Sequence, residues 1–218
     1  MRPVDTPSQP SLRERKKAAT KERIYFEALE LFRRKGFAAS TVEEIAQAAE
    51  VSRGTFFNYF PSKEAVLHHL GERQAQATAA AVQTALADPA LTTRQKLIAV
   101  LRELAAIVEA DRELSQVAVF EYLKLPAVIM ADPHRSRFRQ SLEALLAEGQ
   151  RRGEVTPSLH VQLLSSALTG VYFQQVFEWC AAETPFSLGD QLERLVAVLW
   201  NGVLGDTHAA VDASNGQR

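Results

Sequence analysis

Cysteine and long apolar runs are almost missing from this sequence of 218 residues. Cys180 is its single cysteine, so no disulfide can form within one chain, and a reducing cytoplasm is the simplest compartment. No apolar run approaches the roughly 18 residues that suggest a membrane-spanning helix, so we expect no membrane partner. Residues 1–11 carry three prolines and no apolar core, which predicts a disordered arm rather than a secretory signal.

Motifs of catalysis and of metal binding are also absent from the sequence. It has no Gly-x-Ser-x-Gly, no phosphate-binding glycine loop and no dinucleotide fingerprint, so we expect neither a catalytic residue nor a cofactor. The neighbouring His68 and His69 point apart on a helix and cannot chelate one metal together. His134, His160 and His208 have no ligand spacing, so we expect no metal site. An enzyme is therefore the weaker functional hypothesis.

The net charge of −1 at pH 7 does not by itself suggest a nucleic-acid partner. The charge is unevenly distributed, however. Residues 1–64 contain 12 lysines and arginines against 9 acidic residues, whereas the remainder contains 13 against 17. A basic N-terminal part and an acidic remainder fit a small DNA-binding domain attached to a domain that does not bind DNA.

Helical periodicity fills the stretches between glycines and prolines, and the alternation typical of strands is nearly absent. We therefore predict an all-α fold. The first helix is expected over residues 12–35. Gly36 suits the left-handed residue that commonly ends a helix, and Phe37 can fold back onto the last turn.

Three further helix starts follow closely. Thr41 and Glu44 have the spacing of a capping box, which predicts a short second helix. Ser52 opens a third helix that must stop before Pro61, because proline disfavours the helical conformation of the residue preceding it. Ser62 can then cap a fourth. Two short helices joined by a tight turn, with another packed across them, form the helix-turn-helix that places a helix in the DNA major groove.

The third helix has an outward face suited to DNA. A rotation of about 100° per residue places Phe56, Tyr59 and Phe60 toward the core and Arg53, Gly54, Phe57 and Asn58 outward. An arginine can fork onto guanine or grip a phosphate, and an aromatic ring can pack on a thymine methyl group or a sugar. The basic start of the first helix, with Arg13, Arg15, Lys16 and Lys17, is expected to flank the DNA backbone.

Residues 36–64, which read GFAASTVEEIAQAAEVSRGTFFNYFPSKE, resemble the TetR family of bacterial regulators, and the resemblance covers roughly residues 15–67. It implies DNA contacts at Thr41, Ser52, Arg53, Gly54, Thr55, Phe57, Asn58, Tyr59 and Lys63. Three positions depart from the family pattern. Glu50 stands where many relatives have glycine, and a left-handed backbone there would cost on the order of 1 kcal/mol. Phe57 replaces a common tyrosine, and Tyr59 often corresponds to histidine.

The resemblance also implies how the chain is divided. We expect a helix-turn-helix domain over residues 12–66, a helical ligand-binding and dimerisation domain over 67–204, and a disordered tail over 205–218. The last two long helices, expected at 158–182 and 187–204, would form a four-helix seam between subunits. Its predicted residues are Leu164, Val171, Leu188, Leu192, Leu195, Val196 and Leu199.

The predicted ligand cavity lies in the same helical domain. Its residues are Leu104, Val108, Phe120, Phe138, Leu142, Leu168, Tyr172 and Val176. The aromatic members can equally fill the core, and Cys180 reads as a buried thiol.

Together these features predict a cytoplasmic homodimer that binds double-stranded, palindromic operator DNA. The third helix of each subunit, which we call the reading helix, would enter one of two successive major grooves about 34–36 Å apart. A small apolar effector, unknown in identity, would release this repressor. The alternative is a helical small-molecule-binding or adaptor protein without a DNA-binding role. The positive charges of Arg53 and Lys63 argue against that alternative.

Overall fold

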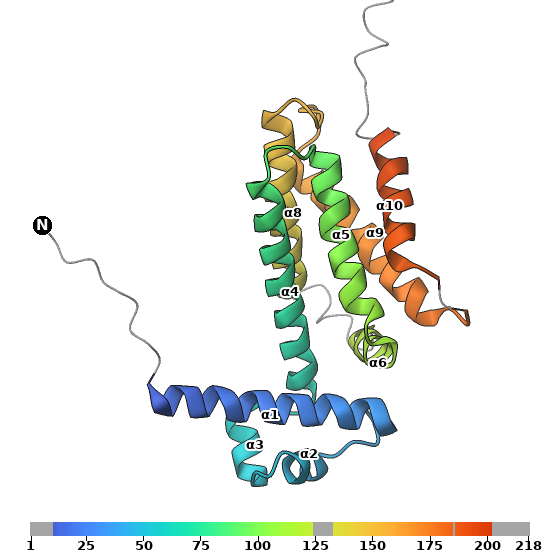
Figure 1. Cartoon of the computed structure of the whole chain (residues 1–218). Helices are drawn as coiled ribbons and strands as arrows, with labels where there is room; N and C mark the ends of the chain where they lie inside the picture. The colour runs from blue at the N-terminus through green and yellow to red at the C-terminus, as the bar shows by residue number, and fades with distance from the viewer. Residues whose placement is uncertain (1–10, 124–132, 185, 202–218) are drawn as a thin grey trace, which may run out of the picture. The chain divides into compact units, whose positions relative to one another are not determined.

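The computed structural model describes residues 11–123, 133–184 and 186–201, and within these ranges the chain is helical without any strand (Figure 1). The chain divides into two compact units, residues 1–69 and 70–218. We call their described parts the head (residues 11–69) and the body (residues 70–201). The predicted tail and all but the last residue of the predicted arm lie outside the described residues. Ser11 is not part of an arm, because it is the N-cap of the first helix.

The head contains α1 (Leu12–Lys35), α2 (Val42–Ala48), α3 (Arg53–Tyr59) and the beginning of α4 (Glu64–Ala87). Figure 1 shows α2 and α3 on the same side of the long α1. The bounds of α1 match the prediction, α2 begins after its predicted cap, and α3 begins after Ser52 and ends before Pro61 as predicted. The helix-turn-helix consists of α2, its turn and α3.

Local side-chain chemistry fixes the helix ends in the head. Gly36 ends α1 with φ 82° and ψ 159°, a conformation that costs glycine little, and its N–H donates to the Phe32 carbonyl at 2.9 Å. The Phe37 ring then packs edge-on against Phe32, with the ring centroids 4.9 Å apart. Thr41 and Glu44 form the predicted capping box at the start of α2. Each boundary is therefore set by residues close to it in sequence.

The head has a small core. Its largest fully buried side chains belong to Ile24, Phe32, Ile45, Phe56 and Val66, and each has 0% of its surface exposed. They come from all four helices of the head, and the recorded packing runs from α1 to α2 and from α2 to α3.

The body is built from the rest of α4 and five further helices. These are α5 (Thr93–Glu109), α6 (Arg112–Leu123), α8 (Pro133–Arg151), α9 (Val161–Ala181) and α10 (Leu188–Leu199). The most extensive packing joins α10 to α5 and α8 to α9, and Figure 1 shows α5, α8 and α10 running roughly alongside one another. None of the helices in the described ranges is both long and apolar enough to cross a membrane.

Two helices of the body begin against carboxylates from distant segments. Glu154 accepts a hydrogen bond from the Thr93 amide at 2.5 Å, and Glu109 accepts one from the Leu188 amide at 2.5 Å. These carboxylates satisfy free N–H groups and complement the positive end of the helix dipole. Next to the first of them, a Cβ atom on Gly149 would lie 2.7 Å from side-chain atoms of Thr93 and Val155. The approach of α8 to the start of α5 therefore requires glycine.

Four of the seven residues predicted for the subunit seam lie inside a single chain. Leu164, Leu188, Leu192 and Val196 are only 0–3% exposed within a single chain, because they pack into the core of the body. The remaining three, Val171, Leu195 and Leu199, are half-buried. The periodic stripe of α10 thus faces α5 of its own chain, and the outer faces of α9 and α10 carry other apolar side chains. Among these, Leu163 is 59% and Val198 is 67% exposed.

Candidate DNA-binding interface

The outward face of α3 is composed as the sequence predicts. Arg53, Gly54, Phe57 and Asn58 are exposed, whereas Phe56 is fully buried. Phe57 stands out because a large aromatic side chain remains 42% exposed on a short helix. On a helix that enters the major groove, an exposed aromatic ring can pack against a thymine methyl group.

Ser52 and Thr55 hold the first turn of α3. The Ser52 hydroxyl accepts a hydrogen bond from the Thr55 amide at 3.0 Å, and the two hydroxyl oxygens lie 2.9 Å apart. This arrangement caps the helix whether or not DNA is present. Tyr59, at the other end of α3, is half-buried.

Arg53 contacts Phe57 on the same face of α3, as periodicity allows, and also a residue of α2 that the sequence did not reveal. Its Nη1 lies 3.0 Å from Oε1 of Glu43 in α2, and its guanidinium carbon lies 5.6 Å from the centre of the Phe57 ring. Helical periodicity reports which residues share a face of one helix, so it could not show a pair between two helices. The guanidinium is therefore oriented before any ligand arrives.

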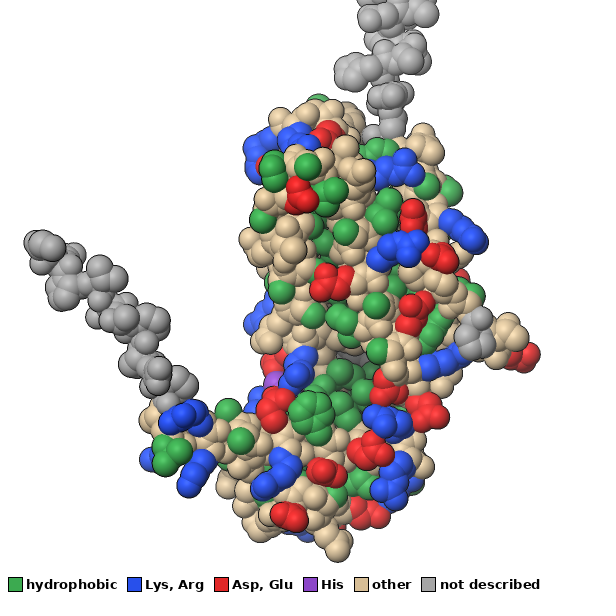
Figure 2. All heavy atoms as spheres, viewed as in Figure 1, with side chains coloured by type: hydrophobic (Ala, Val, Ile, Leu, Met, Phe, Trp, Pro, Cys, Tyr) green, Lys and Arg blue, Asp and Glu red, His purple; other side chains and the backbone are tan. Residues whose placement is uncertain are grey.

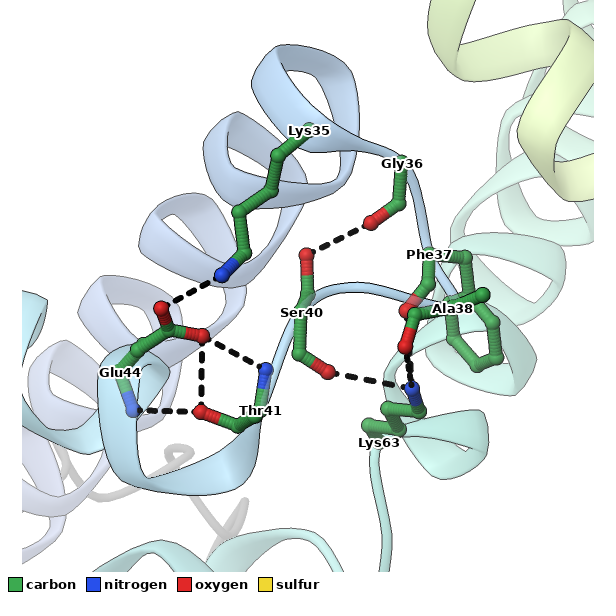
Figure 3. A network of polar contacts seen from close by, with 8 residues as sticks. All are labelled: Lys35, Gly36, Phe37, Ala38, Ser40, Thr41, Glu44 and Lys63. Carbon is green, nitrogen blue, oxygen red and sulfur yellow. Dashed lines mark hydrogen bonds and ion pairs between the residues drawn. The ribbon is translucent and has the colours of Figure 1, made fainter.

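The start of α2 is held by a polar network (Figure 3). Glu44 accepts hydrogen bonds from Lys35 at 2.5 Å, from the Thr41 hydroxyl at 2.8 Å and from the Thr41 amide at 3.0 Å. The hydrogen bond from Lys35, followed by those from Thr41, lowers the pKa of Glu44 to about 2. The Thr41 hydroxyl thus donates inside the protein, and a phosphate contact would have to compete with Glu44 for its proton.

Lys63 also bonds inside the head. Its ammonium group donates to the carbonyl oxygens of Phe37 at 2.8 Å, Ser40 at 3.1 Å and Ala38 at 3.3 Å (Figure 3). It also lies 4.5 Å from the centre of the Phe37 ring. These three carbonyls match the three N–H donors of a lysine ammonium. The structural role of Lys63 joins residues more than twenty positions apart, so no local sequence pattern signals it, and its phosphate contact remains a prediction.

The turn between α2 and α3 has a left-handed residue at Glu50, the position where many relatives have glycine. Glu50 has φ 52°, and it is the only non-glycine residue with positive φ among those described. The turn therefore keeps the geometry that glycine would provide, with glutamate bearing the conformational cost.

Positive charge collects at the beginning of α1. Figure 2 shows lysine and arginine side chains gathered around the first described residues of α1. Arg13, Arg15, Lys16 and Lys17 are exposed there. Such a cluster suits a phosphate backbone more than a base edge.

Most of the predicted ligand residues belong to the packed core of the body. Leu104, Val108, Phe138, Leu142, Leu168, Tyr172 and Val176 are at most 8% exposed. The rings of Phe138 and Tyr172 stack with their centroids 4.8 Å apart. Phe120 differs, because it is 39% exposed. Its ring packs edge-on against Phe177, with the ring centroids 6.2 Å apart. Core packing therefore accounts for the buried members, and their ligand role remains a prediction.

A separate hollow of about 360 Å³ lies where α9 approaches the start of α10. Its lining is largely polar and consists of Gln175, Glu178, Phe186, Ser187, Asp190, Gln191 and Arg194. Cys180, which is also in α9 but does not line this hollow, is 1% exposed. Burial raises the pKa of the Cys180 thiol to about 11, so the thiol is protonated at neutral pH.

A helix-turn-helix with a capped reading helix, joined to a helical body, defines a class of DNA-binding proteins. Comparisons with known proteins identify the family. Residues 24–70 match the model described as bacterial regulatory proteins, tetR family. A Thermus thermophilus FadR, a TetR-family transcriptional repressor solved in complex with lauroyl-CoA, is 30% identical with a TM-score of 0.72, and the match covers 87% of this chain and 98% of that one. The present chain belongs to the TetR family of transcriptional regulators.

Two other relatives show where the similarity concentrates. The regulator TcmR of Streptomyces glaucescens is 51% identical over 61 residues, a match that spans only about a quarter of either chain (28% of this one and 27% of TcmR). Bacillus subtilis FadR, solved with stearoyl-CoA, shares the fold with a TM-score of 0.70 at 24% identity, over 84% of this chain and 98% of that one. Members of this family regulate transcription and are not enzymes.

Proposed function

We propose that this chain is a homodimeric repressor that occupies a palindromic operator and leaves it when a long-chain acyl-CoA binds the body. One observation carries the DNA-binding half of this proposal. A short helix capped at its N-terminus presents Arg53, Phe57 and Asn58 outward while its opposite face is buried. Thr41, Ser52, Gly54, Thr55, Tyr59 and Lys63 are proposed to hold the flanking sugar-phosphate backbone, the last of them in competition with its internal bonds.

The dimer follows from the size of the head and the surface of the body. One short reading helix makes few base contacts, whereas two heads can read two half-sites about 34–36 Å apart. Val171 and Leu195 are half-buried, and the same two helices, α9 and α10, carry the strongly exposed Leu163 and Val198. Burying these exposed apolar side chains against a second copy would be favourable, which supports a symmetric interface through α9 and α10.

The effector is proposed from the Thermus thermophilus FadR, whose complex contains lauroyl-CoA. The body of the present chain offers apolar and aromatic side chains for an acyl chain. Phe138, Tyr172 and Phe173 form one aromatic cluster, and the Arg135 guanidinium lies 5.3 Å from the centre of the Phe173 ring. An arginine beside an apolar cluster suits a ligand with an apolar chain and anionic phosphates. Allosteric coupling of about 1–3 kcal/mol per site would be enough to weaken operator binding by two linked heads.

The test begins by selecting bound duplexes from a random pool with the full-length protein. Gel-shift titrations on the selected operator then compare wild type with Arg53→Ala, which should bind about tenfold to a hundredfold more weakly if Arg53 reads a base. Lauroyl-CoA should release the operator, whereas free CoA and laurate should not. If no sequence is enriched, the chain is the non-DNA-binding alternative. If free CoA releases the operator equally well, an acyl-recognising effector site is ruled out.

A further inference from the structure

A carboxylate, that of Glu43, lies on the surface that faces DNA in the proposed function. The role inferred for it below rests on that proposed function. Glu43 in the first turn of α2 is paired at 3.0 Å with Arg53 in the first turn of α3. Both side chains are well exposed, 58% for Glu43 and 65% for Arg53. A negative charge here repels phosphates, so it is unfavourable for affinity alone.

The pair has a specific geometry. Glu43 holds one Nη atom of the Arg53 guanidinium, and the guanidinium carbon lies 5.6 Å from the centre of the Phe57 ring. Phe57 itself packs edge-on against the buried Phe56, with the centroids 5.5 Å apart. The guanidinium therefore has two orienting partners, and one of the two is anchored in the core of the head.

The N–H donors of Arg53 that Glu43 does not occupy are suited to the edge of a base. A guanidinium carries five N–H donors, so a bond to Glu43 leaves enough of them for a bidentate contact with guanine O6 and N7. A carboxylate partner also cancels most of the long-range attraction between Arg53 and any phosphate. What remains favours a contact that depends on donor and acceptor geometry.

The other acidic groups of this region have different surroundings. Glu44 is engaged by Lys35 and Thr41, and Glu50 forms no ion pair with any described residue. Stabilising the head is an insufficient explanation for the Glu43–Arg53 pair, because exposed ion pairs contribute little to stability.

We propose that Glu43 is a positioning residue that determines specificity: it withholds Arg53 from phosphates and directs it to one base pair of each half-site. Replacing Glu43 should therefore raise affinity for any DNA while lowering discrimination between sequences. The predicted effect is opposite in sign on the two quantities, which a purely structural role would not produce.

The experiment compares wild type, Glu43→Gln, Glu43→Asp and the charge-matched control Glu50→Gln. Each full-length protein is titrated on the selected operator and on a scrambled duplex at several salt concentrations. We expect Glu43→Gln to bind the scrambled duplex about fivefold more tightly per head, as expected from removing one nearby like charge. Its operator-to-scrambled ratio should fall, and the salt dependence should steepen by about one charge per head. Repeated selection should show relaxed preference at one position of each half-site.

The controls separate this inference from the proposed function. Glu43→Asp, which keeps the charge, should retain more of the wild-type ratio than Glu43→Gln. Glu50→Gln should leave the operator-to-scrambled ratio unchanged. If wild type enriches an operator but Glu43→Gln keeps its ratio, the inference is wrong and the proposed function stands. Equal weakening on both duplexes with a lowered melting temperature would make the pair structural and also overturn it. If wild type enriches no sequence, both fall together.

Discussion

The head and the body are stabilised in different ways. In the head, α2 and α3 have seven residues each, and side chains that bond to nearby backbone groups define their ends. In the body, helices of 12–21 residues pack around a continuous apolar cluster. Short helices are marginal in isolation, so the head depends on capping and on a few buried rings. A reading surface needs exposed polar groups held rigidly, and caps provide this rigidity without a large core.

The largest effect should come from the core of the body. We expect Leu192→Ala to lower the free energy of unfolding by about 2–5 kcal/mol, because the side chain is 1% exposed against α5 and its removal leaves a cavity. Val198→Ala on the same helix is the matched control and should change it by less than about 0.5 kcal/mol in the monomer. Urea unfolding measures both values. Equal losses would mean that α10 does not pack as described.

The stability of the head should fall more when the internally bonded Lys63 is replaced than when an exposed cation is replaced. We expect Lys63→Met to cost about 1–3 kcal/mol, because three carbonyl oxygens lose their donor. Arg34→Met, which removes an exposed cation from α1, is the control and should be nearly neutral. Thermal unfolding and hydrogen exchange at residues 37–41 report the change. If Lys63→Met weakens DNA binding while stability and exchange are unchanged, Lys63 acts on phosphate instead.

Relief of backbone strain should stabilise the head. Glu50→Gly should exceed Glu50→Ala in stability by about 1 kcal/mol, because alanine keeps the steric penalty at φ 52° and glycine does not. Both variants remove the same charge, so the difference between them isolates the backbone effect. Chemical denaturation of the two variants side by side measures it. A more stable alanine variant would contradict the left-handed assignment.

The smallest effect concerns acid. Because hydrogen bonds from Lys35 and Thr41 lower the pKa of Glu44 from 4.5 to about 2, the folded head binds its proton less readily than the unfolded chain. Its contribution to stability is complete above pH 4.5 and disappears as the pH falls through about 2. Melting curves between pH 6 and pH 2 should therefore show a smaller loss for Glu44→Gln than for wild type. Parallel losses would mean that Glu44 titrates normally.

The two regions also differ in how well sequence predicts them. The starts of α1, α2 and α3 and the ends of α1 and α3 were predicted because their signals are local. The glycine at 36, the capping box at Thr41 and the proline at 61 each act within a few positions. The outward face of α3 followed from periodicity, and so did the burial of Phe56. The Glu43–Arg53 pair and the carbonyl partners of Lys63 did not follow from periodicity, because they join different segments.

The body shows the limit of periodicity. The apolar stripe containing Leu188, Leu192 and Val196 was recognised, but a stripe does not reveal whether it faces its own chain or a second one. The break between α5 and α6 at Ala110 and Asp111 was also not predicted, since neither residue is a glycine or proline. Tertiary packing decides both the partner of the α10 stripe and the break between α5 and α6. Local sequence patterns do not reveal tertiary packing.

The ammonium of Lys63 also limits how this regulator can be rebuilt. A chimaera that transplants only α2, its turn and α3 would leave behind the donor that closes the loop before α2. The recipient would inherit three carbonyls without their cation, and the reading helix would be held by a looser support. The smallest transferable block therefore extends from Gly36 through Lys63. A shorter exchange should carry over the base-contacting residues without the contacts that orient them.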